Sequence, residues 1–345
     1  MCSIYADDSL IKLALHIKIY IKIYFSCSHR IVGLKWRDEK QNYNWVLSKL
    51  ATTHHFLPRF YLNAFVDPSS RDLRNPFLWV VELQSKILKQ KAPKNVASIT
   101  GFYDWRELKA IAPLIEPIYS QIESRTACVM RKLWNGDLGL TDKDKYHLSI
   151  FLGLQLTRTP RFRRASQDAM IKYVLDRAEN LVGDEECLQK SLDKFNVEDI
   201  KSFVKNRRFN VVPNPDHILQ MTLKSGLAFS VLIFAMQWLF VIAREELRFF
   251  TSDVPVALLT PDAKPRRIDF DAYYNSELEI SFPISPSCIL LLREQEFPEN
   301  VAFAGDDVVN EINRRIFPVA DKYVFCSSEQ QGRWVLAQEI STGIE

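Results

Sequence analysis

Cysteine and glycine are scarce in this sequence, which has six cysteines and ten glycines among 345 residues. The cysteines are widely scattered, and neither a CxxC pair nor a Cys–His spacing typical of zinc ligands occurs. This pattern argues against a disulfide framework and against a zinc site. We therefore expect no cysteine to have a disulfide partner, and a reducing cytoplasm is the expected location.

The motifs of several large enzyme classes are missing as well. The chain has no GxSxG sequence, no glycine-rich phosphate loop and no HExxH sequence. These absences argue against the common serine hydrolases, the P-loop enzymes and the zincins. No motif identifies a cofactor, and a divalent metal, if used, would need carboxylates from separate segments.

The overall composition is that of a globular protein, with 47% hydrophobic and 25% charged residues. The net charge is only +3, so the overall electrostatic field of the chain does not by itself indicate nucleic-acid binding. Basic residues do cluster in RTPRFRR (158–164), KNRR (205–208) and KPRR (264–267). Such clusters are either solvated faces or a surface for the nucleic-acid backbone, which requires several convergent cations.

Residues 1–50 form an atypical N-terminal extension. Isoleucine alternates with lysine and tyrosine from Ile17 to Tyr24, which is the period-two pattern of a strand. Asp7 and Asp8 stand where a signal peptide has a basic leader. A non-ATG start near Val46 is one alternative, and under it the extension is an artefact of the gene start. We expect residues 51–345 to form a single α+β domain.

Within this domain the patterns predict a helical part, about residues 110–247, and a strand-rich part, about residues 248–345. Two apolar-rich halves in Phe77–Lys91 surround a polar break and predict a β-hairpin. Helical spacing of apolar residues predicts a helix over Ala112–Asp137, with Asn135 and Gly136 as its stop. Thr141 is the expected cap of the next helix.

The longest apolar run is SGLAFSVLIFAMQWLFVIA, nineteen uncharged residues from Ser225 to Ala243. Its length approaches the roughly 20 residues that span hydrocarbon. Gly226, Ser230 and Gln237 interrupt it, and charged residues flank it directly. These features favour a helix buried in the middle of a soluble protein. We therefore do not expect a membrane partner, although membrane association is the alternative if this helix is exposed.

Aromatic and β-branched runs with proline punctuation predict strands in the last hundred residues. DDVVNEINRRIF (306–317) is a predicted short helix, and KYVFC (322–326) and RWVLAQEI (333–340) are predicted closing strands. The predicted fold class is α+β, mainly α-helical with a buried central helix, an N-terminal β-hairpin and a mixed C-terminal β-sheet.

Two adjacent histidines, His54 and His55, precede Pro58 and Arg59. Imidazole suits general acid–base chemistry because its pKa lies near neutrality. Adjacent residues point in different directions, so both can serve one site only if the backbone turns. The alternative is that one histidine caps or packs against the helix that begins near Pro58.

Gln155 and Arg158 are polar residues within or near the apolar face of the helix that contains LSIFLGLQLTRT. Glu123 has a similar place at the border of the preceding helix's apolar stripe. A salt bridge between Glu123 and Arg158 is the structural alternative to a site. A third polar position is TSDVP, where Ser252 and Asp253 end an aromatic strand. Asp253 either stabilises a turn or presents a carboxylate for a metal ion or a water molecule.

Taken in order, these landmarks resemble the domain of unknown function 4238 family. The motifs that carry the resemblance are HHFLPRFYLNAF (54–65), KNVASITGFYD (94–104), QLTRTPRFRR (155–164), TSDVPV (251–256) and FPISP (282–286). The resemblance covers roughly residues 54–325. One departure is Val254, where the family pattern often has asparagine. The resemblance implies that the histidine pair, Glu123, Gln155, Arg158 and Asp253 are recurrent features, and it implies no activity.

Two main hypotheses follow for the function. The first is a hydrolase, nuclease-like and acting on a phosphodiester or similar anion. Its candidate catalytic residues are His54, His55, Glu123, Arg158 and Asp253, and its candidate substrate-binding residues are Gln155, Arg161, Arg59 and Ser252. The alternative is a non-catalytic binding or interaction module for nucleic acid or protein, in which the polar cluster is structural. It predicts that Glu123, Gln155 and Arg158 form a closed, buried network with no adjoining pocket.

Overall fold

The computed structural model describes residues 53–102, 112–183, 202, 204–206, 211–244, 246–259 and 278–338. All of them belong to one compact unit, Ala51–Glu345. The N-terminal extension, the KPRR stretch and the two arginines of KNRR lie outside the described residues. The predicted extension and its boundary with the α+β domain therefore stay predictions.

The predicted N-terminal hairpin is confirmed. Strand β2 (Leu78–Glu82) pairs antiparallel with β3 (Ile87–Lys91). Lys86 adopts a φ of 53° in the turn between them, a conformation that tight hairpin turns require. Before the hairpin, β1 (Thr53–His55) pairs with β4 (Ser98–Thr100), and the short helix α3 (Arg59–Leu62) begins directly after Pro58.

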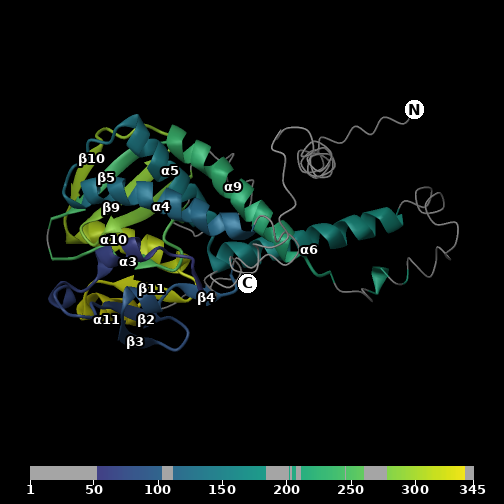
Figure 1. Ribbon diagram of the computed structural model, residues 1–345, viewed down its shortest axis with the longest axis horizontal. Coiled ribbons are helices and arrows are strands. Elements are labelled where there is room, and N and C mark those ends of the chain that lie inside the picture. Colours follow the sequence, from purple (N-terminus) through teal and green to yellow (C-terminus); the bar gives the residue numbers. More distant parts are fainter. Residues whose placement is uncertain are drawn as a thin grey trace, which may run out of the picture. The chain divides into compact units, whose positions relative to one another are not determined.

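The hairpin joins the C-terminal part of the chain in one sheet, with the order β3-β2-β11-β6. Figure 1 shows β2 and β3 beside β11. Strand β11 (Tyr323–Cys326) lies between β2 and β6 (Thr251–Ser252) and is antiparallel to both. Helix α11 (Glu329–Ala337) contacts β2, β3 and β11. The prediction of a closing strand over RWVLAQEI is wrong, because Ser328 caps a helix through the Gln331 backbone N–H and the helix buries Val335.

A second, five-stranded sheet is mixed, as predicted. Strand β10 is parallel to β5, and the other neighbouring pairs are antiparallel. In spatial order the strands are β10 (Val301–Ala304), β5 (Gln237–Ala243), β9 (Cys288–Arg293), β8 (Glu279–Ser285) and β7 (Ala257–Leu259). Helix α10 (Asp306–Ile316), also predicted, follows β10 and contacts both edges of this sheet, β10 and β7.

The helical part follows the local signals of the sequence. Helix α4 (Ala112–Trp134) ends just before Gly136, whose φ of 82° is the left-handed conformation that stops helices. Thr141 caps α5 (Asp142–Thr157) in a capping box with Asp144. Helix α6 (Pro160–Gly183) starts at the proline that interrupts the helical pattern.

Helix α9 (Pro215–Ala235) packs against α5 at a very short distance. A Cβ atom at Gly153 of α5 would lie 2.3 Å from the carbonyl oxygen of Gly226 in α9, so only glycine fits there. Gly226 faces α5 in the same way, because a Cβ atom added there would lie 2.7 Å from the Thr157 hydroxyl oxygen. The two glycines therefore set the spacing of the central helix pair.

The prediction of one buried helix through Ser225–Ala243 needs two corrections. The helix ends at Ala235, and β5 begins at Gln237, because the segment from Trp238 pairs with β9 and β10 inside the mixed sheet. In addition, α9 is buried on one face only: Leu227 is 53% and Val231 71% exposed. Strand structure thus begins inside the segment predicted as helical. By length and composition alone, His217–Ala235 is apolar enough to cross a membrane, a test that core helices also pass.

The predicted fold class, a mainly helical α+β protein with an N-terminal hairpin and a mixed C-terminal sheet, is confirmed. One side chain connects its parts. The fully buried Tyr61, in α3, hydrogen-bonds the Thr251 hydroxyl of β6 over 2.6 Å and donates to the Pro283 carbonyl of β8 over 2.9 Å. The N-terminal segment is therefore fastened to both sheets.

Candidate functional site

The predicted histidines lie in β1, where adjacent side chains point to opposite faces. His54 is buried and His55 is partly exposed. The backbone does not turn between them, because both pair in register with β4. The two imidazoles therefore do not share one site, and only His55 is open to solvent.

The carbonyl oxygen of Phe56 collects the polar groups of the helical part. It accepts hydrogen bonds from Nε of Arg158 over 2.7 Å and from Nε2 of Gln155 over 2.9 Å. Nη1 of Arg158 lies 2.8 Å from Oε1 of Glu123, and its guanidinium carbon lies 5.0 Å from the centre of the Tyr119 ring. We call Phe56, Glu123, Gln155 and Arg158 the Phe56 brace. It confirms the predicted burial of Gln155 and the predicted Glu123–Arg158 salt bridge.

His55 borders the brace without forming part of it. Its Nε2 lies 3.2 Å from the carbonyl oxygen of Lys94. Burial lowers the pKa of His55 below 6.5, and the positive charges of Arg59 and Arg158 lower it further. The Lys94 hydrogen bond and the charge of Glu123 act in the opposite direction. The imidazole is therefore mainly neutral at pH 7, within electrostatic range of one carboxylate and two guanidinium groups.

Asp253 forms a second structural centre. Its Oδ1 accepts the backbone N–H of Asp321 over 2.9 Å, and its Oδ2 accepts those of Lys322 and Tyr323 over 2.8 and 3.2 Å. Burial raises the pKa of this carboxyl to about 7, although the three N–H groups oppose the shift. The neighbouring Ser252 hydroxyl donates to the Val254 carbonyl and accepts the Val254 backbone N–H. These contacts hold the start of β11 beside β6.

The arginines of RTPRFRR each have an acceptor within the protein, and of the four only Arg164 is exposed. Arg161 donates to the carbonyl of Val319, and Arg163 donates to the carbonyl of Phe102 over 2.6 Å. Arg164 pairs with Asp321 over 2.5 Å. Burial lowers the pKa of Arg161, and the nearby Asp321 and Asp253 raise it. Because each guanidinium has an acceptor in the protein, this stretch provides no row of unengaged cations for a nucleic-acid backbone.

The predicted site residues thus divide between two places. Those near Phe56 connect the N-terminal segment to α4 and α5. Asp253 holds segments within the strand-rich part together, and Arg161 connects that part to α6 through the Val319 carbonyl. Arg59 lines one separate pocket of about 190 Å³, and the buried Ser252 lines another of about 10 Å³. Within the described part of the chain, no group of three or more His, Cys, Asp or Glu is placed to hold a metal ion.

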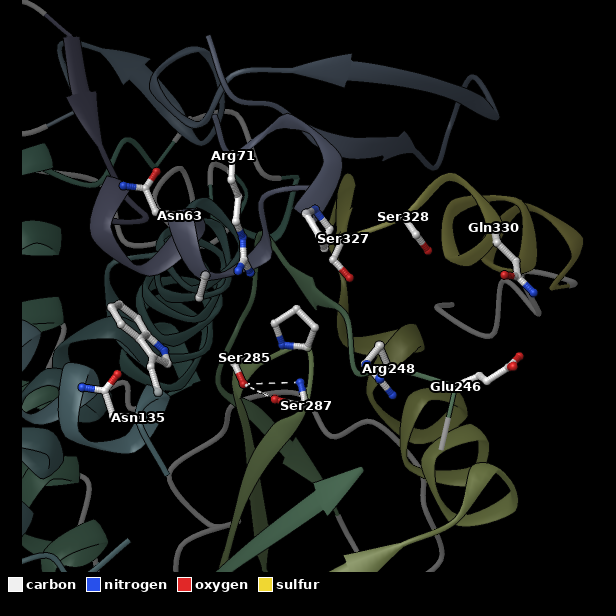
Figure 2. A pocket seen from close by; sticks show the side chains of 14 residues that line it. Asn63, Arg71, Asn135, Glu246, Arg248, Ser285, Ser287, Ser327, Ser328 and Gln330 are labelled. Carbon is white, nitrogen blue, oxygen red and sulfur yellow. Dashed lines mark hydrogen bonds between the residues drawn. The ribbon is translucent and has the colours of Figure 1, made fainter. Parts of the chain in front are cut away.

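A polar pocket of about 760 Å³ lies elsewhere, and none of the predicted site residues lines it (Figure 2). Five segments form its walls: the connection between α3 and β2, the end of α4, the segment after β5, the β8–β9 turn and the β11–α11 connection. Its polar side chains include two arginines, four serines and one glutamate. We call this space the polar pocket.

Hydrogen bonds fix the walls of the polar pocket. Nε1 of Trp134 donates to the carbonyl of Ile284 over 3.0 Å, which fastens the end of α4 to β8. The carbonyl of Arg248 accepts from Nδ2 of Asn313 over 2.9 Å and from Nε2 of Gln331 over 2.6 Å. The strand ends and helix ends around the space therefore have defined positions, which preorganises the pocket for a ligand.

Sequence reasoning missed the polar pocket for a physical reason. Its serines, Ser285, Ser287, Ser327 and Ser328, lie in turns, where serine is common for local backbone reasons alone. Arg71 lies in an exposed loop and gives no periodic signal. Only the proline-flanked serines of SPS (285–287) mark a tight turn in the sequence, and they do not indicate what the turn faces.

Fold and site together define an α+β protein with an internal polar network that is partly exposed at Glu123, and with a separate polar pocket. The chain belongs to the DUF4238 family, whose model, described as "Protein of unknown function (DUF4238)", matches residues 53–330. No curated protein and no solved structure matches the chain. The match confirms the family that the sequence motifs resemble, over nearly the same residues.

Proposed function

We propose that the protein is a non-catalytic binding module for a small polar molecule, and that the polar pocket is its binding site. One observation carries the proposal: the residues suited to catalysis are engaged in internal bonds, whereas the open pocket is lined by other residues. A volume of about 760 Å³ falls in the range of small-molecule sites. Its preformed hydrogen-bonding groups suit recognition of a polar ligand.

The chemistry of the lining supports binding over catalysis. Among the described residues that line the polar pocket there is no histidine, cysteine, aspartate or lysine. The four serines thus lack an imidazole to act as their general base, which serine nucleophiles require. Glu246 is the one carboxylate of the lining, and it is exposed. The lining can donate and accept hydrogen bonds, and it has little means of moving a proton.

A thermal-shift screen of the full chain tests the proposal with common sugars, amino acids, nucleosides and their phosphate esters. Ser287→Trp, at an exposed position of the β8–β9 turn, places a bulky indole at the pocket, and Ser85→Trp, in the exposed β2–β3 turn, is the matched control. We expect at least one compound to stabilise the wild type and Ser85→Trp, and not Ser287→Trp. A stabilising compound that binds Ser287→Trp equally well, or one that the wild type converts to product, would contradict the proposal.

The hydrolase hypothesis is the second candidate, and one observation favours it. The half-buried, mainly neutral His55 lies within electrostatic range of Glu123, Arg59 and Arg158, an arrangement compatible with a general base. Assays of phosphodiester cleavage with Mg²⁺ test it on His55→Ala, with His54→Ala as the neighbouring control. Cleavage that only His55→Ala abolishes, at an unchanged melting temperature, would favour the hydrolase over the binding module.

A cytoplasmic location is part of the same proposal. The described cysteines, Cys128, Cys288 and Cys326, form no disulfide with one another. Burial raises the pKa of the Cys288 thiol to about 12, which keeps it protonated. Free thiols of this kind are stable in a reducing compartment. Fractionation of cells that express the full chain would test the location, which we expect to be the cytosolic fraction.

A further inference from the structure

We propose that the polar pocket binds a phosphate monoester, with the phosphate held between Arg71 and Arg248. The inference rests on the proposed binding function and adds the chemical class of the ligand. It starts from the charges of the lining, which are two arginines against the single carboxylate of Glu246. The described lining residues of the pocket therefore carry a net positive charge.

Arg71 is the cation available to a ligand. It is exposed, lies in the loop that follows the short turn Pro68–Ser70, and extends into the space above the Ser285–Ser287 turn (Figure 2). No described residue accepts a hydrogen bond from its guanidinium. This distinguishes Arg71 from the arginines of RTPRFRR, whose guanidinium groups have protein acceptors.

Arg248 completes the pair from another wall. Its Nη1 donates to the carbonyl of Leu247 over 2.8 Å, which orients the guanidinium, and its own carbonyl is held by Asn313 and Gln331. Two guanidinium groups on separate segments suit an anion that lies between them. Guanidinium forks match the oxygen geometry of phosphate, and two cations match its charge of nearly −2.

Hydroxyl groups from two turns surround the same space. Oγ of Ser285 and Oγ of Ser287 lie 3.2 Å apart in the β8–β9 turn. Ser328 caps α11 across the pocket, so the positive end of that helix also faces the site. A carboxylate has two oxygens to offer, whereas a phosphate monoester offers three terminal oxygens to two arginines and several serines. The number of donors therefore favours phosphate.

The volume indicates that the ligand is larger than the anion alone. Inorganic phosphate would fill only a small part of about 760 Å³. The half-buried Trp134 and Pro286 line the pocket beside the polar groups. They offer an apolar surface to the organic part of a phosphate ester, and Trp134 uses its N–H within the protein. Phenyl phosphate, which combines both chemistries, is a suitable probe.

The test is calorimetric titration of the full chain with phenyl phosphate, and with inorganic phosphate, benzoate and phenyl glucoside for comparison. We expect phenyl phosphate to bind best, and Arg71→Ala to raise its Kd at least tenfold. Arg74→Ala, also exposed and three residues further along the same loop, should leave the Kd unchanged. Arg71→Lys should recover part of the affinity for phenyl phosphate that Arg71→Ala loses, because lysine keeps the positive charge but lacks the paired N–H donors of the guanidinium.

The outcomes separate this inference from the proposed function. If phenyl phosphate does not bind the wild type, or binds Arg71→Ala as well as Arg74→Ala, the phosphate site is wrong. If phenyl glucoside binds instead and Ser287→Trp abolishes it, the binding function stands without the phosphate. If phenyl phosphate binds through Arg71 and is hydrolysed, the phosphate site stands and the non-catalytic function fails.

Discussion

The Phe56 brace and the polar pocket use similar chemical groups under opposite conditions. In the brace, Arg158 is 5% exposed and bonds Glu123 and the Phe56 carbonyl, which in turn accepts from Gln155. In the pocket, Arg71 is exposed and extends into open space. A buried guanidinium that bonds other groups of the protein stabilises the fold. A guanidinium that faces an open pocket is able to bind a ligand. Burial and partners, more than residue type, decide between the two roles.

The largest expected effect is on the brace. Replacing Arg158 with leucine leaves the Phe56 carbonyl with one donor fewer and Glu123 without its partner. We expect the free energy of unfolding to fall by about 3 kcal/mol, the lower end for breaking a buried ion pair, because Glu123 is partly exposed. Urea unfolding measures it, with the exposed Arg131→Ala as control. A loss of less than about 1 kcal/mol would show that the brace is not structural.

Asp253 should make the stability depend on pH. Burial raises its folded pKa from 3.8 to about 7, so its stabilising contribution is complete at low pH and is lost as pH rises through about 7. We expect wild type to lose free energy of unfolding relative to Asp253→Asn between about pH 4 and pH 8.

Unfolding in urea at stepped pH measures this difference, and Asp168→Asn, on the exposed face of α6, is the control. The free energy of unfolding of Asp168→Asn should change with pH in the same way as that of the wild type. If the free energy of unfolding of the wild type also changes with pH in the same way as that of Asp253→Asn, the Asp253 carboxyl has the same pKa in the folded and unfolded chain.

A smaller effect is expected at Gln155. Its Nε2 bonds the Phe56 carbonyl, whereas its Oε1 is buried without a hydrogen-bond partner among the described residues. Gln155→Leu removes one hydrogen bond and also one unsatisfied oxygen, so we expect a loss of only about 1 kcal/mol by urea unfolding. Combined with Arg158→Leu, the loss should be more than additive, because the buried Phe56 carbonyl then loses both of its side-chain donors. Strict additivity would show that the two donors act independently.

The smallest effect on stability is expected in the polar pocket. Arg71→Ala changes an exposed side chain with no acceptor in the described part of the protein, so the free energy of unfolding should change by less than about 0.5 kcal/mol. Arg74→Ala should behave in the same way. If Arg71→Ala destabilises the chain as strongly as Arg158→Leu does, the contrast between brace and pocket is lost.

Local signals predicted the elements that local chemistry decides. Gly136 ends α4, Thr141 caps α5, and the polar break in Phe77–Lys91 turns a hairpin. The patterns failed where distant pairing decides. The apolar run from Ser225 ends as a strand because β9 and β10 flank it, and RWVLAQEI forms a helix that contacts the hairpin sheet.

The candidate site shows the same difference between features that local sequence decides and features that distant contacts decide. The pairing of Glu123 with Arg158 could be predicted, because both are polar residues at apolar helix faces. The partners of Asp253 could not, because they are backbone N–H groups about seventy residues away in sequence. The polar pocket could not be predicted either, since five separate segments build it and each looks like an ordinary turn or helix end.

The most direct test is a crystal structure of the full chain with phenyl phosphate bound. We predict that the phosphate lies in the polar pocket within hydrogen-bonding distance of Arg71 and Arg248, with the phenyl ring towards Trp134, while the Phe56 brace keeps its contacts. A phosphate bound beside His55 and Glu123, with the brace opened to receive it, would contradict the division between scaffold and binding site and would restore the catalytic hypothesis.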